Sequence, residues 1–338
     1  MKYPTILAIE SSCDETSASV IQNGKILSNI IATQQVHQQW GGVVPELASR
    51  EHQKNIVPVV DASLKQSKVQ FSDLDAIAVT KGPGLLGSLL VGTTFAKGLS
   101  LALRVPLIAV NHMEAHVLAH FIEEPYPSFP FLCLTVSGGH TQIVLVEDYL
   151  QMKVIGQTQD DAVGEAFDKT AKLLGLPYPG GMLIDRLAQK GNPEAFQFPQ
   201  VAVPNYDFSF SGIKTAILYF LQKNTSQNPN FVQENLADIC ASVQHTFVKM
   251  LISKLKRAAK ELQIREIAIA GGVSANSELR KTVIQTGEKY NWNVYIPDLQ
   301  YCTDNAAMVA IAAHYKYLAG LFADSTFSPD ASLAIGQE

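Results

Sequence analysis

The chain contains an internal repeat, and self-similarity of this kind constrains a fold more than any single element does. Residues 5–21 show an apolar strand, a small polar loop and an alternating strand, and residues 131–147 show the same order and lengths. Ser, Gly and Thr in both loops have small side chains that let backbone N–H groups approach an anion closely. The repeat predicts two similar halves, each with a phosphate-binding hairpin.

A second pair of segments shows a buried strand that runs through a glycine turn into a helix. One begins at Asp75 and the other at Glu266. The first N–H groups of a helix lack partners and the helix dipole favours negative charge, so such a turn can bind an anion. One turn alone would be an ordinary tight turn, but four anion-binding loops in matching order predict an α/β fold with duplicated mixed sheets flanked by helices.

This doubled pattern resembles the two-domain actin-like ATPase (ASKHA) fold of actin, sugar kinases and Hsp70, in which two domains close on a nucleotide. Three prolines in residues 123–130 interrupt a helical pattern, and proline ends helices. We therefore expect a first domain over 1–128 and a second over 129–304. The resemblance implies that a C-terminal helix and tail, 305–338, complete the first domain.

Composition excludes several classes. With 338 residues, 47% of them hydrophobic, and a net charge of -5, the chain can bury two cores but has no globally basic surface for nucleic acid. Its four cysteines form no C-x-x-C pair, so neither a thiolate zinc site nor a disulfide framework is indicated. The apolar region 85–110 contains Lys97 and Arg104, which predicts a buried helix and strand, a cytoplasmic location and no membrane association.

Three histidines, His112, His116 and His120, are spaced at i, i+4 and i+8 and would roughly share one face of a helix. Two imidazoles one turn apart can bind one transition metal ion with ligands from elsewhere, although a solvated histidine stripe is the ordinary alternative. Asn111 is a suitable N-cap after an apolar strand, which would place His112 and His116 at the ligand-binding edge of a sheet. We expect His120 to serve packing or solvent.

The same segment raises the alternative of a metal-dependent endopeptidase. In the H-E-x-x-H motif the glutamate that acts as the base directly follows the first histidine. Here that position is Met113, and Glu114 points roughly 100° further around the helix. The peptidase is therefore disfavoured on geometry, and a nucleotide-binding scaffold without chemistry is the remaining alternative.

Further motifs, in order along nearly the whole chain, resemble the universal threonylcarbamoyl transferase family, called TsaD in bacteria. They lie at residues 41–52, 111–116, 136–141, 161–169, 178–181, 209–214, 270–276 and 302–308. The resemblance implies an acyltransferase that moves the threonylcarbamoyl group of threonylcarbamoyl-AMP to tRNA. The acceptor would be the N6 amine of the adenosine immediately 3′ of the anticodon, in tRNAs that read codons beginning with A.

The resemblance also implies a metal centre of His112, His116 and Asp304. It implies one divalent ion per subunit, with Fe²⁺ favoured and Zn²⁺ as the alternative. Thr303 or Asp304 would also suit the cap of the last helix, expected from about 303 to 321. We expect Asp304 to face the two histidines from the other domain.

Nine residues are assigned by the same resemblance to the adenylate or ATP site in the interdomain cleft: Thr135, Val136, Ser137, Gly138, Gly139, Asp168, Gly181, Asp185 and Asn276. Glycine loops offer backbone donors to phosphate, and carboxylates can accept hydrogen bonds from ribose or base. Asp185 could instead pair with Arg186 or Lys190 on an exposed helix, where such pairs are weak.

Two departures from the wider pattern matter. Thr135 stands where archaeal and eukaryotic relatives have a tyrosine, so a phenolate cannot contribute and water or substrate is expected at the fourth metal position. The first loop lacks the D-x-G of many ATPase relatives, which argues against efficient ATP hydrolysis by this chain alone.

For the chemistry, we hypothesise that the metal polarises the carbonyl of the donor and that Asp14 or Glu15 receives the proton of the amine. The amphipathic segment 248–262 carries Lys249, Lys254, Lys256, Arg257 and Lys260. It is one candidate for tRNA contact, as are Lys214 and Arg50, although a charged helix face is usually just solvated. Since the chain is mildly acidic, we expect helper proteins, which the resemblance implies are TsaB-like and TsaE-like.

Overall fold

The computed structural model describes residues 4–200 and 203–337, and its contacts divide the chain into two compact units. Unit 1 comprises the chain up to Tyr126, the segment Glu147–Lys153 and the chain from Pro297 onward. Unit 2 comprises Pro127–Val146 and Val154–Ile296. We expected the second domain to extend to residue 304, whereas the units change at 296–297. Asp304 therefore belongs to the same unit as the two histidines.

The sheet of unit 1 has the strand order β3-β2-β1-β4-β5. β1 pairs antiparallel with β2, and β2 with β3, while β1, β4 and β5 are parallel. The strands are β1 (Thr5–Glu10), β2 (Glu15–Gln22), β3 (Lys25–Thr33), β4 (Ala76–Gly82) and β5 (Leu107–Asn111). Every residue of β1 is buried, because both faces of this central strand are covered by helices.

The sheet of unit 2 repeats this topology as β10-β9-β6-β7-β8. β6 pairs antiparallel with β7, and β6, β9 and β10 are parallel. The strands are β6 (Phe131–Val136), β7 (Thr141–Asp148), β8 (Gln151–Gln157), β9 (Glu266–Ala270) and β10 (Asn293–Tyr295). The predicted repeat is thus confirmed, since β1 to β5 correspond in order to β6 to β10.

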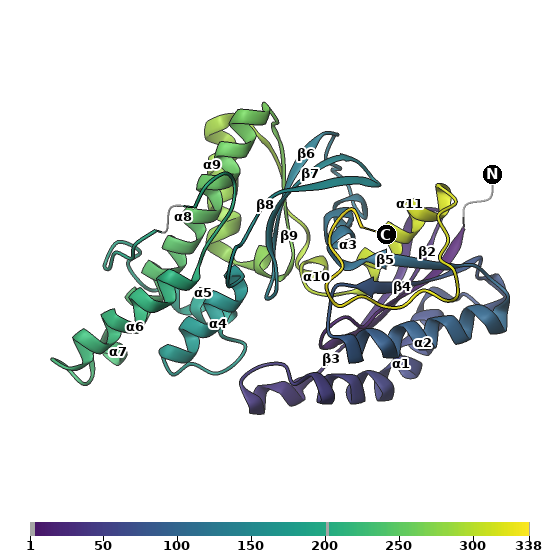
Figure 1. Ribbon diagram of the computed structural model, residues 1–338, viewed down its shortest axis with the longest axis horizontal. Helices are drawn as coiled ribbons and strands as arrows, with labels where there is room; N and C mark the ends of the chain where they lie inside the picture. Colours follow the sequence, from purple (N-terminus) through teal and green to yellow (C-terminus); the bar gives the residue numbers. More distant parts are fainter. Residues whose placement is uncertain (1–3, 201–202, 338) are drawn as a thin grey trace. The chain divides into compact units, whose positions relative to one another are not determined.

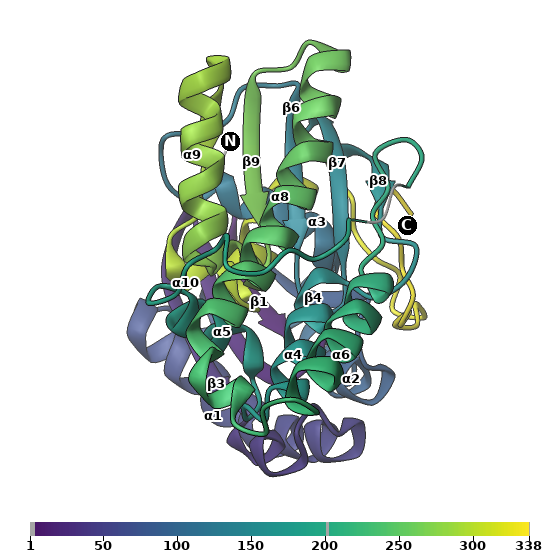
Figure 2. The same cartoon turned by 90° about the vertical axis from the view of Figure 1, so that its left-hand side faces the viewer.

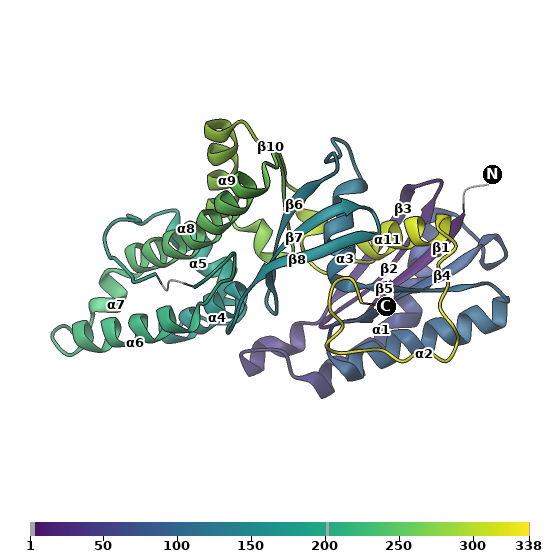
Figure 3. The ribbon, with the colours of Figure 1, turned by 45° about the horizontal axis from the view of Figure 1, so that its top comes forward.

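Helices cover both faces of the unit 1 sheet (Figure 1). On one face lie α1 (Pro45–Ser67) and α2 (Leu86–Leu103), and on the other lie α3 (His112–Leu118) and α11 (Ala306–Leu318). α11 runs along the sheet (Figure 3) and contacts all five strands. Its first nine residues are buried, because their alanines let the helix approach the strands closely. The C-terminal helix does pack on the first unit.

In unit 2, six helices among the described residues accompany the sheet, compared with α1, α2, α3 and α11 on the sheet of unit 1. They are α4 (Val163–Leu173), α5 (Gly180–Ala188), α6 (Ser211–Thr225), α7 (Phe231–Glu234), α8 (Leu236–Leu262) and α9 (Ser277–Tyr290). Figure 2 shows α8 and α9 side by side. Phe247 of α8 packs edge-on against Phe167 and Phe210 in the core.

Short elements complete the chain. A one-turn helix, α10 (Leu299–Cys302), precedes α11. The 3₁₀ turns are η1 (Gln35–Trp40), η2 (Phe71–Asp73), η3 (Ala119–Phe121) and η4 (Gly272–Ala275).

Among the described residues, α2 is long and apolar enough to cross a membrane by length and composition. It corresponds to the helix predicted within 85–110, and β5 follows as the predicted strand. One face, with Leu89, Gly92 and Ala96, is buried, and the helix packs on α1 and β4.

Two glycine turns bring corresponding strand ends into backbone contact. A Cβ on Gly84, after β4, would lie 2.5 Å from the carbonyl oxygen of Ser12, and one on Gly271, after β9, would lie 2.5 Å from that of Val136. Gly271 also has φ +86°, a region that favours glycine. Both predicted glycine turns therefore place a helix start directly beside a hairpin loop.

We predict that Gly271→Ala destabilises the protein by about 1 to 3 kcal/mol or more, since a side chain at this φ is strained and would also collide with Val136. Gly272→Ala is the matched control, because a Cβ there has no neighbour within 4 Å among the described residues. Urea unfolding of both variants measures the difference. Equal midpoints would show that the close approach has no energetic weight.

Candidate metal centre and nucleotide pocket

The histidine helix α3 begins where β5 ends. The side-chain oxygen of Asn111 accepts hydrogen bonds from the backbone N–H of Met113 and Glu114, at 2.9 and 3.3 Å, which confirms the predicted N-cap. The cap sets the helix start, so the rings of His112 and His116 lie one turn apart in edge-to-face contact, 4.7 Å between centroids. The α-helix ends at Leu118, and the buried His120 lies in η3 instead.

Asp304 directly precedes the cap of α11. The prediction that Thr303 or Asp304 is the N-cap is wrong, because Asn305 fills that position and accepts from the N–H of Met308. The carboxylate of Asp304 therefore does not serve the helix end. Its Oδ1 lies 3.1 Å from Nε2 of His116 and 3.4 Å from Nε2 of His112.

The three side chains form a group that fits a metal ion. One ligand atom from each lies within 4.8 Å of the others. A tetrahedral ion about 2.1 Å from its ligands needs them about 3.4 Å apart, which agrees with both Asp304 distances. Two imidazoles and one carboxylate leave open positions, as in mononuclear iron sites and catalytic zinc sites.

Glu10 supports this group from behind. Its buried carboxylate lies 3.1 Å from Nδ1 of His112 and accepts hydrogen bonds from the hydroxyl of Thr80 and the N–H of Ser12. An acceptor at Nδ1 keeps the proton there and leaves Nε2 for a metal, as carboxylates behind metal-binding histidines commonly do. Sequence reasoning missed this role. The available signal was a carboxylate at the end of an otherwise apolar, buried strand.

The imidazole of His112 lies between the negative charges of Asp304 and Glu10 and compensates part of them. Burial alone would lower its pKa, but the negative charges of Asp304 and Glu10 outweigh burial and raise that pKa well above its ordinary value. The pKa values of Asp304 and Glu10 are lowered, because His112 outweighs their burial. Burial, with the neighbouring charge of His112, lowers the pKa of His116. Without metal, the protonated imidazole of His112 therefore lies between the carboxylates of Glu10 and Asp304. A bound metal ion would replace that positive charge.

Of the candidate bases, Asp14 ends the β1–β2 loop and Glu15 is the first residue of β2. Burial first, then the negative charges of Asp304 and Asp14, raises the pKa of Glu15 to about 10. The loop is fastened to α1 by His52, whose ring contacts the carbonyl of Cys13 at 2.9 Å and the hydroxyl of Thr16 at 2.8 Å. His52 therefore fixes the start of β2, where Glu15 lies close to the charges of Asp304 and Asp14.

Unit 2 contains a pocket of about 410 Å³. Five of the nine residues predicted for the adenylate line it: Gly138, Asp168, Gly181, Asp185 and Asn276. Thr135, Val136, Ser137 and Gly139 are not among the lining residues. The first two belong to β6, and the N–H of Ser137 donates to His140 across the hairpin. The pocket therefore joins the hairpin loop to the helix starts.

The polar residues of the pocket also hold its walls. Asp168 accepts from the N–H groups of Gly180 and Gly181 at 2.8 and 3.1 Å. Asp185 accepts from the hydroxyl and N–H of Ser277, so the alternative of pairing with Arg186 or Lys190 is not observed. Asn276 caps α9.

Sequence reasoning did not identify Arg186 as a pocket residue, because it was considered only as a partner for Asp185. Arg186 lines the pocket in the structure and brings a positive charge to it. Phe167 and Met182 also line it and add apolar surface.

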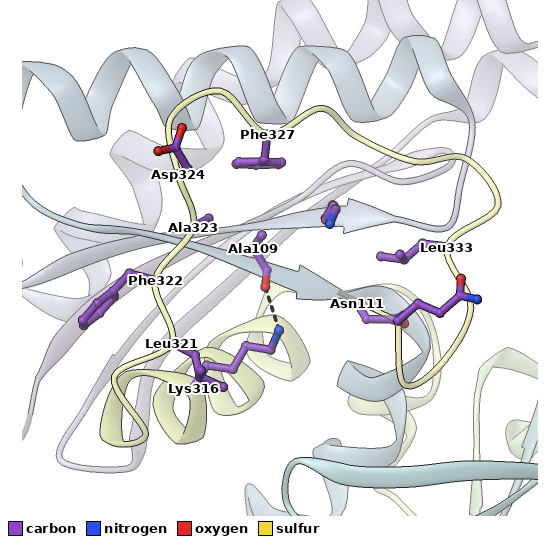
Figure 4. Close-up of a pocket in the computed structure, with 11 residues that line it drawn as sticks. Ala109, Asn111, Lys316, Leu321, Phe322, Ala323, Asp324, Phe327 and Leu333 are labelled. Atoms are coloured by element: carbon purple, nitrogen blue, oxygen red, sulfur yellow. Dashed lines mark hydrogen bonds between the residues drawn. The ribbon is translucent and has the colours of Figure 1, made fainter.

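A smaller pocket of about 230 Å³ lies in unit 1 under the C-terminal segment (Figure 4). Lys316 of α11 donates to the carbonyl of Ala109 in β5 at 3.1 Å, and Phe327 and Leu333 line the cavity. Asn111 also lines it and donates to the carbonyl of Ala334. The tail that encloses this pocket thus holds the N-cap of the histidine helix.

The duplicated sheets define an α/β protein with the actin-like ATPase (ASKHA) fold. Full-length HypF aligns with a TM-score of 0.64 at 14% identity, over 94% of this chain and 47% of that chain. Component A of (R)-2-hydroxyglutaryl-CoA dehydratase from Acidaminococcus fermentans aligns with a TM-score of 0.54 at 16% identity, over 94% and 100%. At these identities the likeness shows the fold alone.

Sequence comparison is more specific, and by it the chain belongs to the TsaD family of tRNA N6-adenosine threonylcarbamoyltransferases. The family model matches residues 25–311. The enzyme of that name from Cytophaga hutchinsonii is 61% identical over 332 residues, 98% of this chain and 97% of that protein. The one from Christiangramia forsetii is 62% identical, over 94% and 95%. The activity is therefore that of a transferase acting on tRNA, and the peptidase and scaffold alternatives are not supported.

We predict that Glu10→Gln weakens metal binding about 10- to 100-fold, the usual effect of removing the carboxylate behind a metal-binding histidine. The substitution keeps the shape but removes the charge that fixes the proton on Nδ1 of His112. Titration of the metal-free protein with Co²⁺, followed by visible absorption, measures the affinity.

Glu114→Gln is the matched control for this measurement. Glu114 lies on the same helix, but its Oε1 accepts from the N–H of Gly336, so metal affinity should not change. Equal Co²⁺ affinity of Glu10→Gln and the unaltered protein would show that Glu10 does not position His112.

Proposed function

We propose that this transferase takes the threonylcarbamoyl group from threonylcarbamoyl-AMP. The acceptor is the N6 amine of the adenosine immediately 3′ of the anticodon, in tRNAs that read codons beginning with A. The family membership supports the reaction, and the observation that carries the site is the convergence of His112 and His116 on one oxygen of Asp304. The donor is a mixed anhydride with AMP as leaving group, and the acceptor amine is weak because its lone pair is delocalised. Catalysis must therefore activate the carbonyl and fix the geometry.

His112, His116 and Asp304 would hold one divalent ion per subunit, with Fe²⁺ favoured by the family resemblance and Zn²⁺ as the alternative. When bound, the ion supplies a Lewis acid for a carbonyl oxygen. Glu10 keeps His112 in the tautomer that this binding needs. Thr135 has no phenolate to offer, so water or substrate would complete the coordination of a bound ion.

The adenylate, or ATP, would occupy the unit 2 pocket. Its size suits such a ligand, since small-molecule pockets usually measure about 300 to 1,000 Å³. Gly138 and Gly181 offer backbone approach to the phosphate, and Arg186 supplies positive charge. Asp168, Asp185 and Asn276 shape the walls. Thr135, Val136, Ser137 and Gly139 form the hairpin that carries Gly138.

Of the two candidate bases, Asp14 suits the role better. A carboxyl group with a pKa of about 10, as in Glu15, keeps its proton at neutral pH and cannot accept another. A hydrogen bond joins the carboxyl groups of Glu15 and Asp14, so Glu15 would hold Asp14 in position. Asp14 would then receive the proton that the amine loses.

The chain would work in the cytoplasm with TsaB-like and TsaE-like helper proteins. The need for helper proteins is supported by the family resemblance and by a net charge of -5, because this charge disfavours unaided binding to a polyanion.

We predict that His112→Ala lowers the formation of threonylcarbamoyladenosine at least about 100-fold, because loss of a ligand should exceed the 10- to 100-fold effect of losing a supporting residue. Mass spectrometry of nucleosides measures the product after incubation with tRNA, threonine, bicarbonate, ATP, the adenylate-forming enzyme and the helper proteins. AMP binding should be unchanged, because the pocket lies in unit 2. Full modification by the variant would rule out this centre.

We predict that Asp14→Ala slows single-turnover transfer from preformed threonylcarbamoyl-AMP about 10²- to 10⁴-fold, as expected for loss of a general base. Glu15→Ala should slow it less. A larger effect at Glu15 would reverse the two roles, and unchanged rates in both variants would exclude the loop as the source of the base.

A further inference from the structure

The basic residues of α8 fall into two groups. Lys254 donates to the backbone carbonyls of Val203 and Asn205, at 2.6 and 3.0 Å. Arg257 pairs with Glu261 at 2.7 Å and lies over the ring of Tyr206, 5.7 Å from its centroid. These two cations are therefore already engaged within unit 2.

The second group faces solvent. Lys249, Lys256 and Lys260 are exposed, and their spacing of 7 and 4 residues places them on one stripe of the helix. The end of the neighbouring α9 adds two exposed residues, Lys289 and Tyr290. None of these four lysines forms an ion pair with any residue of 4–200 or 203–337. We call Lys249, Lys256, Lys260, Lys289 and Tyr290 the α8–α9 basic surface.

The ring of Tyr290 contacts two lysines of this surface. The Nζ atoms of Lys256 and Lys289 lie 5.0 and 5.9 Å from the centroid of its ring, within the range of cation–π attraction. The phenol's pKa is lowered, first by a hydrogen bond with Lys256 and then by the charges of Lys256, Lys289 and Lys260. Two ammonium groups thus lie over one aromatic ring, and Lys256 also makes a hydrogen bond with its hydroxyl.

Such an arrangement favours an anionic partner. Like charges held close together repel, and a bound anion relieves that repulsion. The nearby carboxylate of Glu261 is occupied by Arg257 and by the hydroxyl of Tyr206. Glu288 precedes Lys289 and is exposed, but it forms no ion pair among the described residues. The surface is therefore locally positive on a chain whose net charge is -5.

We propose that the α8–α9 basic surface binds the phosphate backbone of the tRNA substrate. The proposal rests on the proposed function, because that function supplies a polyanionic substrate. Lysines spaced along exposed helices contact phosphates without reading sequence, and they make affinity depend on salt. An exposed aromatic ring among the lysines is also typical of RNA-binding surfaces.

The test compares tRNA binding by the unaltered full chain and by Lys256→Gln/Lys289→Gln from 50 to 200 mM salt, with and without the helper proteins. Losing two phosphate contacts should reduce the slope of log affinity against log salt by about 1.4 to 1.8. At 0.1 M salt the affinity should fall about 30-fold. Lys172→Gln/Lys223→Gln, which changes two exposed lysines of α4 and α6 in the same unit, should leave both quantities unchanged.

Unchanged affinity and slope in Lys256→Gln/Lys289→Gln would overturn the proposal and leave the proposed function standing. Equal losses in both double variants would overturn it too, because the effect would then be one of net charge. A surface for an acidic protein is indicated instead if poly-glutamate binding falls while tRNA binding stays. If the unaltered chain binds no tRNA, even with the helper proteins, the proposed function fails as well.

Discussion

The metal group depends on a buried pair of opposite charges, the carboxylate of Glu10 and the imidazole of His112. Burying either charge alone would be costly, and the opposite charge 3.1 Å away offsets part of that cost, as Asp304 also does for His112. Thr80 and Ser12 satisfy the remaining acceptor sites of the carboxylate, which fixes its position. The pair links β1, β4 and α3, so the orientation of the ligand follows from the packing of the sheet.

The duplicated topology explains why binding chemistry appears twice, in different forms. In both units a glycine turn, Gly84 after β4 or Gly271 after β9, lies against the backbone of the hairpin. In unit 2 this edge is lined by glycines and opens into a pocket. In unit 1 the corresponding turn carries Asp14 at its end and Glu15 at the start of β2, and Glu15 lies close to the charge of Asp304. One framework thus supports a ligand pocket in one unit and charged side chains in the other.

Much of this could be predicted from the sequence, because the deciding signals are local. Apolar strands, glycine turns and the Asn111 cap are each specified by a few consecutive residues, and the duplicated sheets and the histidine spacing followed from them. The role of Glu10 could not be predicted in this way, since it depends on a contact across 102 residues. The same holds for Asp185, whose partner Ser277 is 92 residues away. The cap of α11 was predicted wrongly because Thr303, Asp304 and Asn305 are all suitable, and only packing selects the last.

The order of residues along the chain determines when the side chains of this centre can meet. The histidines are made early, but Asp304 is made almost 200 residues later. Ala334 and Gly336, which hold Asn111 and Glu114, come later still. A nascent chain on the ribosome therefore carries the two imidazoles long before it has the carboxylate of Asp304. The tail residues that bond to Asn111 and Glu114 come last. Chains that stop short of the tail would leave the start of the histidine helix without these restraints, and the three side chains of the candidate centre can meet only once residue 304 has been made.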